Sequence, residues 1–580
     1  MIKKQILAFG ILCFTNFIGY AQLLKPINFA DIRTRGELNI RAQKNLDRLE
    51  SDIYTPEKVF PPREENTAGW PGDYEGRVLV SLIVESQAAH RKPKYLEEMM
   101  RMLPQKLNRD GYFGALQSDI IQEQQLSGNS WLLRTLCEYY YWKRDPKMKE
   151  YLERVIRNLV LPTKGYHAIY PIDPKERDKT KGAAIGYAEK IIGKWRVSSD
   201  IGTDFVFLDG IVQAYGIIPS PELKSIIDEI VARFLEIDLK GMKVQAHATL
   251  TGLRGLLRYY SITKQPYLLQ AVIQRYNLYR STSMTADFEN FNWFDRPEWT
   301  EPCAIVDSYL LAVQLWQYTN KPFYLEDAHH IYYNGIANTQ RANGGFGLNN
   351  CPRPGYNSLN VNENEAWWCC TMRGGEGLAR AIQYSYFIGV KEIVIPFFNN
   401  SVATLKLGNQ TVTLNQTSVY PFEGKVSFDV LNSSLNSAFT IKVFAPYWTK
   451  KHKLTLNGRS IPFVLRNGFL IFKPKLSKGN KIVLTFDQQI KAEHMVNQEY
   501  SKPDFYTLNY GPLILGIDNT NKQPEISFTK LPKFTRLTDR DWMAGTNGIH
   551  FSTVYQLLDP KVTKESGYSK QILFKIADLK

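Results

Sequence analysis

The segment Cys303-Ala-Ile-Val-Asp-Ser-Tyr-Leu-Leu-Ala-Val-Gln-Leu-Trp-Gln-Tyr318 carries apolar residues at the spacing of an α-helix, and similar segments stand on both sides of it. From about residue 78 to 385 they follow one another, separated by short polar or Gly/Pro-containing connections. The clearest of the others are residues 131–141, 148–159, 205–215, 221–235, 247–260, 267–279 and 324–338. We expect about ten to twelve helices, which suggests antiparallel hairpins closing into a toroid, although periodicity alone also permits an open solenoid.

The pattern changes near Val390, where apolar and polar residues begin to alternate as in β-strands. Strands are expected at residues 402–407, 411–414, 425–430, 440–444, 454–456, 469–472 and 482–486. Turn sequences such as Leu456-Asn-Gly-Arg and Ser477-Lys-Gly-Asn separate them, which predicts an all-β sandwich. A further apolar strand, Tyr510-Gly-Pro-Leu-Ile-Leu-Gly, follows, and the tail either extends the sandwich or forms a small lobe.

The N-terminus resembles a secretory signal peptide. Lys3 and Lys4 precede an apolar run from Ile6 to Ile18, and Gly19-Tyr-Ala21 has the form of a cleavage site. We therefore expect export to the periplasm or the extracellular medium, with residues 1–21 removed. The predicted domains are then a helical domain at 22–388, a β-sandwich at 389–500 and a β-rich extension at 501–580. After the signal no apolar run is long enough to cross a bilayer.

Length and composition indicate a globular protein of two or three domains, with 44% hydrophobic and 13% aromatic residues. The net charge of +15 fits either an acidic polysaccharide partner or a solvated basic surface without a specific role. Lysine and arginine are scattered, and no zinc-finger, helix-turn-helix or P-loop signature occurs, so the sequence does not favour nucleic-acid binding. The sequence leaves the oligomeric state open.

The cysteines form the most informative chemical pattern. Cys303 follows Glu301, and two adjacent thiols, Cys369 and Cys370, end the segment Glu365-Ala-Trp-Trp-Cys-Cys. Soft thiolates beside a carboxylate are typical ligands of zinc, so these four residues are predicted to bind Zn²⁺. The alternative is a structural disulfide between Cys303 and either member of the pair, since an exported protein meets oxidising conditions. Five cysteines remain after signal removal, so at least one does not pair within the chain.

This order of motifs resembles the β-L-arabinofuranosidases of glycoside hydrolase families 127 and 146, formerly a domain of unknown function. The resemblance spans most of the chain. Besides the cysteines it rests on Trp70-Pro-Gly-Asp-Tyr-Glu-Gly-Arg, His247-Ala-Thr-Leu, Tyr324-Leu-Glu-Asp-Ala-His-His-Ile-Tyr-Tyr-Asn-Gly, Tyr420-Pro-Phe-Glu-Gly and Tyr510-Gly-Pro-Leu.

The resemblance implies an (α/α)6 barrel with zinc bound by Glu301, Cys303, Cys369 and Cys370, and it implies Cys369 as the nucleophile. Zinc keeps a coordinated thiol deprotonated, but tight binding weakens the sulfur as a nucleophile, so the zinc–sulfur bond has to loosen during attack. Glu289, in Asp287-Phe-Glu-Asn-Phe, matches the acid/base of the families. Its rivals nearby are Asp287, Asp295 and Glu298.

Four further residues are candidates for substrate binding. The resemblance gives His247 a hydrogen bond to a sugar hydroxyl, and a structural cap is the alternative. Arg373 either binds a carboxylate of the substrate or pairs with Glu365 or Glu376. Trp367 and Trp368 form either a sugar platform or packing around the metal. The chain departs from the families at Gly128-Asn129, where Gly-His is expected, and at Thr371-Met-Arg373, where Pro and Asn are usual.

The expected function is that of a retaining, exo-acting β-L-arabinofuranosidase or a related glycosidase acting on oligo- or polysaccharides, with plant cell-wall glycan as the partner. One alternative is a polysaccharide lyase that cleaves an acidic glycan, although the sequence offers no distinct His/Tyr pair for it. The other is a non-catalytic glycan-binding protein with a structural zinc ion.

Overall fold

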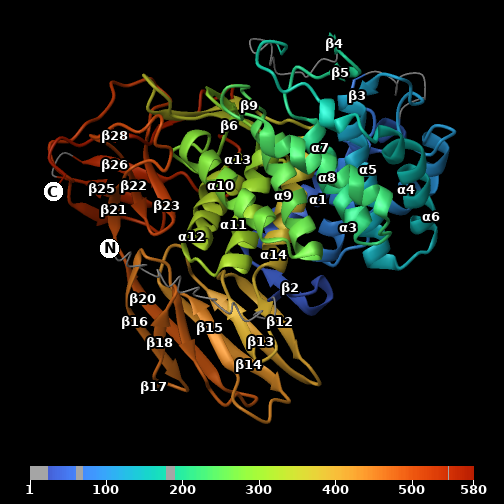
Figure 1. Ribbon diagram of the computed structural model, residues 1–580. Helices are drawn as coiled ribbons and strands as arrows, with labels where there is room; N and C mark the ends of the chain where they lie inside the picture. The colour runs from blue at the N-terminus through green and yellow to red at the C-terminus, as the bar shows by residue number, and fades with distance from the viewer. Residues whose placement is uncertain (1–23, 61–68, 178–189, 546–547, 580) are drawn as a thin grey trace, which may run out of the picture.

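The computed structural model describes residues 24–60, 69–177, 190–545 and 548–579, so the predicted signal peptide lies outside the described residues. The helical part occupies the centre, a β-sandwich lies below it, and a second β-rich lobe, red in Figure 1, lies beside it. The predicted fold class, a helical domain followed by β-sheet domains, is confirmed.

Two concentric rings of helices form the central domain. Among the described residues six inner helices each contact the next, and the last closes on the first; these are α3 (Asp73–Ala89), α5 (Glu123–Lys143), α7 (Asp204–Tyr215), α9 (Ala246–Thr263), α11 (Pro302–Thr319) and α14 (Cys370–Gln383). Six outer helices cover them: α1 (Glu37–Leu49), α4 (Leu96–Lys106), α6 (Lys147–Val155), α8 (Pro221–Glu236), α10 (Pro266–Thr282) and α12 (Phe323–His330). The array is therefore a closed (α/α)6 toroid and not an open solenoid.

The sequence explains which helices lie inside. Outer helix α8 buries one stripe, Leu223, Ile226, Ile227, Ile230, Val231 and Phe234, as expected of a helix with one solvated face. Inner helix α11 is instead buried almost all round, from Pro302 to Trp316. Short helical pieces complete the domain: α2 (Pro56–Val59), α13 (Ala337–Thr339) and the π-helical turns Ile156–Val160 and Ile331–Ile336.

Two sheets form the β-sandwich. In the described chain one has the strand order β17 (Arg459–Ser460), β16 (Thr449–Leu456), β20 (Lys481–Gln488), β14 (Lys425–Ser433), β13 (Gln410–Ser418), β12 (Asn400–Leu407), β2 (Ile32–Arg35). The other has the order β1 (Lys25–Pro26), β10 (Phe387–Ile388), β11 (Glu392–Ile395), β15 (Thr440–Phe444), β19 (Phe469–Phe472), β18 (Val464–Arg466). Strand β20 alternates as predicted, with Ile482, Leu484 and Phe486 buried. The N-terminal strands β1 and β2 supply an edge to each sheet before the barrel begins, which the sequence did not predict.

The C-terminal residues form a lobe of their own that also reaches the barrel. Its sheet has the order β24 (Phe534–Arg536), β25 (Asp541–Ala544), β26 (Ile549–Thr553), β23 (Leu513–Asp518), β27 (Ser569–Gln571), β9 (Ser358–Glu363), β8 (Leu348–Asn350), β7 (Arg296–Thr300), β6 (Phe291–Trp293), and β21 (Ile490–Glu493), β22 (Phe505–Tyr510) and β28 (Phe574–Lys575) join it at the side. The lobe has a small separate core around Trp542 and Phe551. Because β27 pairs with β9, the tail braces the strands that lead into the inner helices.

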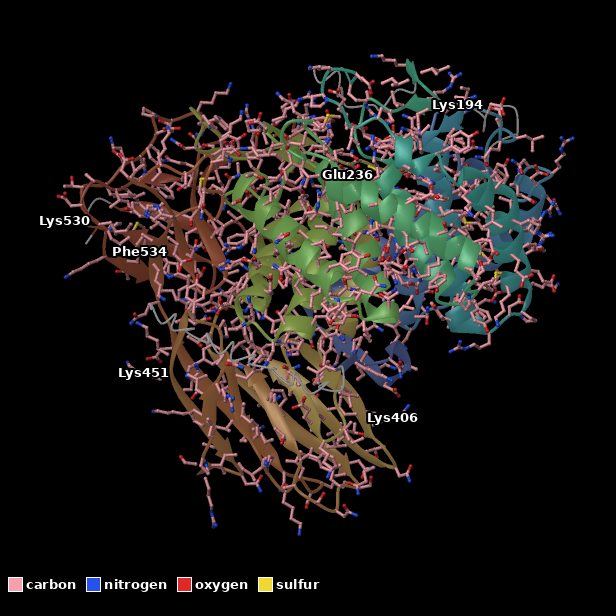
Figure 2. All side chains as sticks on the ribbon, viewed as in Figure 1. Lys194, Glu236, Lys406, Lys451, Lys530 and Phe534 are labelled. Atoms are coloured by element: carbon pink, nitrogen blue, oxygen red, sulfur yellow. The ribbon has the colours of Figure 1, made fainter. Side chains whose placement is uncertain are left out.

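Two observations bear on membranes and on charged partners. No helix in the described part of the chain is long and apolar enough to span a membrane. Exposed lysines lie far apart in Figure 2, with Lys194 on a loop at the barrel, Lys406 and Lys451 on the sandwich, and Lys530 on the C-terminal lobe. A small sheet of β3 (Ile121–Gln122), β5 (Trp195–Val197) and β4 (Lys190–Ile192) lies at the barrel, near Lys194.

Candidate active site

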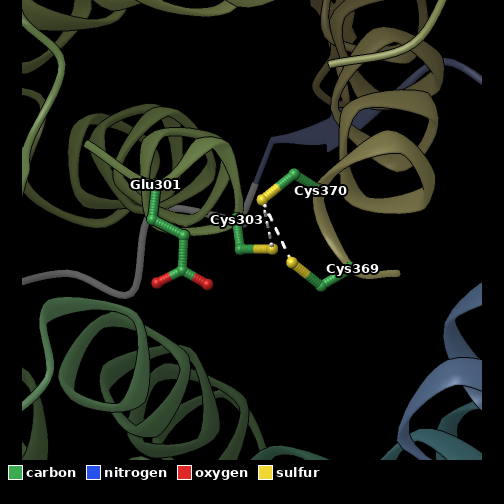
Figure 3. A group of neighbouring side chains, drawn as sticks. All are labelled: Glu301, Cys303, Cys369 and Cys370. Carbon is green, nitrogen blue, oxygen red and sulfur yellow. Dashed lines mark hydrogen bonds between the residues drawn. The ribbon is translucent and has the colours of Figure 1, made fainter. Parts of the chain in front are cut away.

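The four predicted metal ligands meet where the inner helices begin. Glu301 directly precedes α11, Cys303 lies in its first turn, and Cys369 and Cys370 stand at the start of α14. Figure 3 shows the four side chains converging, and their ligand atoms all lie within 4.8 Å of one another. We call this group the cysteine centre. Helix N-termini present unpaired N–H groups and a positive dipole end, which favours thiolates there.

The thiols of the cysteine centre are not joined. Cys303 Sγ lies 3.6 Å from Cys370 Sγ, and Cys369 Sγ lies 3.2 Å from Cys370 Sγ, whereas a disulfide bond is about 2.0 Å long. Every cysteine in the described residues is free. The structural disulfide considered from the sequence is therefore not formed.

The residues of the cysteine centre fit a zinc ion. Tetrahedral zinc with bonds of about 2.3 Å holds its sulfur ligands about 3.8 Å apart. The sulfurs of Cys303 and Cys370 are 3.6 Å apart, close to this distance, and those of Cys369 and Cys370 are 3.2 Å apart, somewhat nearer. Glu301 supplies the fourth donor, and its buried Oε2 has no hydrogen-bond partner. An orphaned buried carboxylate oxygen is costly, so a cation that accepts its lone pair would remove the penalty.

Cys369 differs from the other two thiols. Its side chain is partly exposed, while those of Cys303 and Cys370 are buried. Hydrogen bonds from the thiols of Cys303 and Cys370 lower the pKa of Cys369 to about 6, whereas burial raises the pKa of both neighbours well above the usual range. Burial also raises the pKa of Glu301. Of the three thiols, Cys369 is thus the one that ionises first and the one that is partly exposed.

The predicted acid/base, Glu289, lies in a second group with Asp287 and Cys351, whose ligand atoms also lie within 4.8 Å of one another. Glu289 is fully buried and accepts hydrogen bonds from Thr300 Oγ1 (2.5 Å), Asn349 Nδ2 (2.7 Å) and Asn338 Nδ2 (3.0 Å). Burial, and next the charge of Asp287, raises the pKa of Glu289 well above its usual range. Glu289 therefore holds its proton to a higher pH than an ordinary glutamate does.

The three rivals of Glu289 have different surroundings. Asp287 is buried, and its oxygens accept from Thr285 Oγ1 at 2.7 Å and Cys351 Sγ at 3.4 Å. Asp295 is exposed, and Glu298 forms an ion pair with Arg296 at the surface.

His247 lies beside the cysteine centre, in the first turn of α9. Its Nδ1 is 3.7 Å from Glu301 Oε1 and its Nε2 is 3.5 Å from Asp307 Oδ2, while its ring stacks on that of Trp131. Burial, and next the charge of Arg77, lowers the pKa of His247 well below its usual value, so the ring is neutral. A neutral imidazole offers one donor and one acceptor to its surroundings.

Arg373 takes one of the structural roles that the sequence left open. It is buried and pairs with Glu376 and Asp307. The same acids bind two more arginines, since Arg134 Nη2 lies 2.5 Å from Glu376 Oε1 and Arg254 Nη1 lies 2.7 Å from Asp307 Oδ1. Arg373 thus belongs to an ion-pair network inside the barrel.

Trp367 and Trp368 are 46% and 44% exposed, directly before Cys369. Their rings meet edge to face, with centroids 5.8 Å apart, and Trp367 also contacts the ring of Tyr74. Tyr54 donates a hydrogen bond to the carbonyl oxygen of Trp367, which fixes this turn of the backbone. The two indoles are therefore about half exposed, at positions that directly precede Cys369.

Asn129 stands where the resemblance led us to expect a histidine. It is buried, its Oδ1 accepts from the N–H of Phe113, and its Nδ2 donates to the carbonyl oxygens of Phe113 and Gln125. Asn129 therefore holds a loop in place.

One site residue was missed from the sequence. Arg77, in α3, donates from Nη1 to Cys303 Sγ at 3.3 Å and is held by Asp73 through two hydrogen bonds of 2.8 Å. Both residues belong to the motif Trp70-Pro-Gly-Asp-Tyr-Glu-Gly-Arg. The sequence signal for this pair was an aspartate four residues before an arginine at the start of a helix, which is the spacing of an ion pair on one helix face.

Comparison with known proteins supports the predicted relation. Residues 392–488 match the family model described as "Beta-L-arabinofuranosidase, GH127 middle domain". No curated protein sequence matches the chain. Two solved structures share its fold: a GH127 β-arabinofuranosidase (13% identity, TM-score 0.70, 96% of this chain and 99% of that one) and a GH127 β-L-arabinofuranosidase from Geobacillus stearothermophilus T6 (12%, 0.69, 95% and 100%). The chain is thus a relative of this family, as its motifs predicted.

Proposed function

We propose that this relative of glycoside hydrolase family 127 is a retaining, exo-acting glycosidase that cleaves β-L-arabinofuranosides or related plant-glycan sugars. The observation that carries the proposal is the cysteine centre itself, in which a partly exposed thiol of lowered pKa lies among two buried thiols and Glu301. It lies in a fold that matches two GH127 β-arabinofuranosidases over 95% or more of the chain.

The proposed nucleophile is Cys369. Zinc held by Glu301, Cys303, Cys369 and Cys370 would keep these thiols deprotonated. The Cys369 thiolate attacks the anomeric carbon as the glycosidic carbon–oxygen bond breaks, which gives a thioglycosyl enzyme. Cys303 and Cys370 are buried and remain in place.

The proposed proton donor is Glu289. Its raised pKa favours the protonated form, from which it would deliver a proton to the departing oxygen. In the second step the resulting carboxylate takes a proton from water, the water oxygen attacks the anomeric carbon, and the Cys369 thiolate leaves. Two displacements at one carbon retain its configuration.

The proposed substrate site lies in front of Cys369. Trp367 and Trp368 offer apolar faces on which a sugar ring stacks, and His247 offers a hydrogen bond. The signal-like N-terminus supports action outside the cytoplasm, in the periplasm or the medium, where plant glycans are met.

The direct test compares wild type with Cys369→Ala on an aryl β-L-arabinofuranoside, with zinc measured in both. We expect turnover to fall by roughly three orders of magnitude or more in the variant. Cys137→Ala, which changes a buried thiol in α5 outside the cysteine centre, is the matched control and should keep full turnover. Full turnover of Cys369→Ala would refute the mechanism.

A closed structural zinc is the competing reading, because all four tetrahedral positions would be filled by protein. It predicts stoichiometric zinc and no turnover of any glycoside by the wild type, whereas the proposed mechanism requires turnover.

A further inference from the structure

We infer that Arg77 is a positioning residue that holds the sulfur of Cys303 in the metal-binding set, so that Cys303 stays fixed while Cys369 reacts. This inference rests on the proposed function. It gives a role to the motif Trp70-Pro-Gly-Asp-Tyr-Glu-Gly-Arg, whose contribution was open from the sequence.

The motif fixes how α3 enters the barrel. Gly72 has a left-handed backbone (φ 86°), and a Cβ there would lie 2.8 Å from the ring of Phe113, so glycine is required. The N–H of Gly72 donates to Glu75 Oε2 at 3.1 Å, which caps the helix. Asp73 then stands at the first helical position and Arg77 one turn later, on the same face.

The side chain of Arg77 is held from two sides. Its Nε and Nη2 donate to the two oxygens of Asp73, and its guanidinium carbon lies 4.4 Å from the centre of the Trp131 ring. Arg77 is 6% exposed, so water does not compete for it. The remaining nitrogen, Nη1, lies 3.3 Å from Cys303 Sγ. A guanidinium held in this plane fixes the directions of its Nη1 N–H groups, one of which points to Cys303 Sγ.

The contact between Arg77 and Cys303 places a positive charge beside a centre that is negatively charged when it holds a metal ion. Three thiolates and the Glu301 carboxylate carry four negative charges, and a divalent cation carries two positive ones, so the loaded centre keeps two negative charges in a buried place. Uncompensated buried charge is costly. A hydrogen bond from a cation to one sulfur offsets part of that cost and draws electron density from that sulfur, as outer partners of metal ligands do.

The contact also separates the thiols by role. The sulfurs of Cys303 and Cys369 both contact that of Cys370, but Cys303 is buried and accepts a hydrogen bond from Arg77, whereas Cys369 is partly exposed. The proposed mechanism needs one sulfur that leaves the metal and others that stay. The hydrogen bond from Arg77 identifies Cys303 as a sulfur that remains bound to the metal.

The test uses the full chain and two metals. Zinc affinity is measured by competition with a chromophoric chelator, and cobalt-loaded protein is examined for its thiolate-to-cobalt charge-transfer band. For Arg77→Met we expect zinc affinity to fall roughly 10- to 100-fold and the band to shift. Arg77→Lys keeps the charge but loses the two-pronged contact with Asp73, so its affinity should also fall. Arg258→Met removes an arginine that pairs with Asp209 and is the matched control, for which neither quantity should change.

Unchanged affinity and an unchanged band in Arg77→Met would overturn the inference alone and leave the proposed function standing. If Arg77→Met does not fold, as judged by circular dichroism of the metal-free protein, Arg77→Lys decides in the same way. If the wild type binds neither zinc nor cobalt, both the inference and the proposed function are overturned.

Discussion

Thr300 Oγ1 donates a 2.5 Å hydrogen bond to Glu289 Oε2, and Thr300 is the residue directly before Glu301. The end of strand β7 therefore joins the predicted acid/base to the predicted metal ligand. We expect a change at Glu289 to affect proton transfer and not metal binding, because Glu289 accepts hydrogen bonds from Thr300, Asn338 and Asn349, none of which belongs to the cysteine centre.

Glu289→Gln tests the proton donor. We expect the rate on an aryl glycoside with a poor leaving group to fall by roughly 10²- to 10⁴-fold, with zinc content unchanged. The fall should be smaller for a good leaving group, which needs no proton. Since burial raises the pKa of Glu289, its protonated form persists to a higher pH than that of an ordinary glutamate and is lost as pH rises through the raised pKa. Wild-type activity should therefore decline on the alkaline side of the pH profile, and the variant should lack that decline. Glu298→Gln, at the surface rival, should leave the rate unchanged; loss there and not in Glu289→Gln would move the role to Glu298.

Trp367→Ala and Trp368→Ala test the sugar platform. Both indoles are nearly half exposed, so the free energy of unfolding should change little. Loss of stacking worth about 0.5–1.5 kcal/mol should raise KM roughly 2- to 10-fold. A large loss of stability or of zinc in these variants would instead assign the pair to packing around the metal.

Arg373→Met separates the two roles considered for that arginine. Removing one partner of a buried ion pair leaves Asp307 and Glu376 less compensated, so we expect the free energy of unfolding to fall by about 3–5 kcal/mol. Denaturant unfolding measures this. A variant of unchanged stability whose KM rises for an acidic sugar alone would show that Arg373 binds substrate.

Glu85→Gln tests a buried acid in α3. Glu85 is fully buried, neither of its oxygens has a hydrogen-bond partner, and burial raises its pKa well above the usual range. A folded-state pKa above the unfolded one means that the folded protein holds an extra proton, so stability falls as pH rises above about 4.3, by up to about 1.4 kcal/mol per pH unit. Glutamine cannot ionise, so the free energy of unfolding of the variant, relative to that of wild type, should be higher at pH 8 than at pH 5. Urea unfolding at the two pH values checks this, and an equal difference at both would contradict it.

Much of the fold could be predicted from the local periodicity of apolar residues in the sequence. Helix α8, predicted at 221–235, runs from Pro221 to Glu236, and strand β20 contains the predicted residues 482–486. Strands β1 and β2 were not foreseen, because two and four residues carry too little alternation to signal pairing with β10 and β12 far along the chain. Pairing of β27 with β9 is likewise set by tertiary packing and leaves no local trace.

The site was predictable where residue type alone decides the chemistry. Three thiols and a carboxylate are typical metal ligands, so the residue types alone predicted that they lie together, and the barrel brings them together. The contact of Arg77 with Cys303 was not predictable, since it joins residues 226 positions apart and exists only because α14 closes the ring on α3, beside α11.

The most direct test of Cys369 as the nucleophile is peptide mass mapping after an activated β-L-arabinofuranoside is mixed with the protein and turnover is quenched with acid. If Cys369 is the nucleophile, a pentose adduct forms on the peptide that contains Cys369, bound through that sulfur, and is absent from Cys369→Ala. An adduct on another residue, or undiminished turnover by a zinc-loaded Cys369→Ala protein, would contradict it.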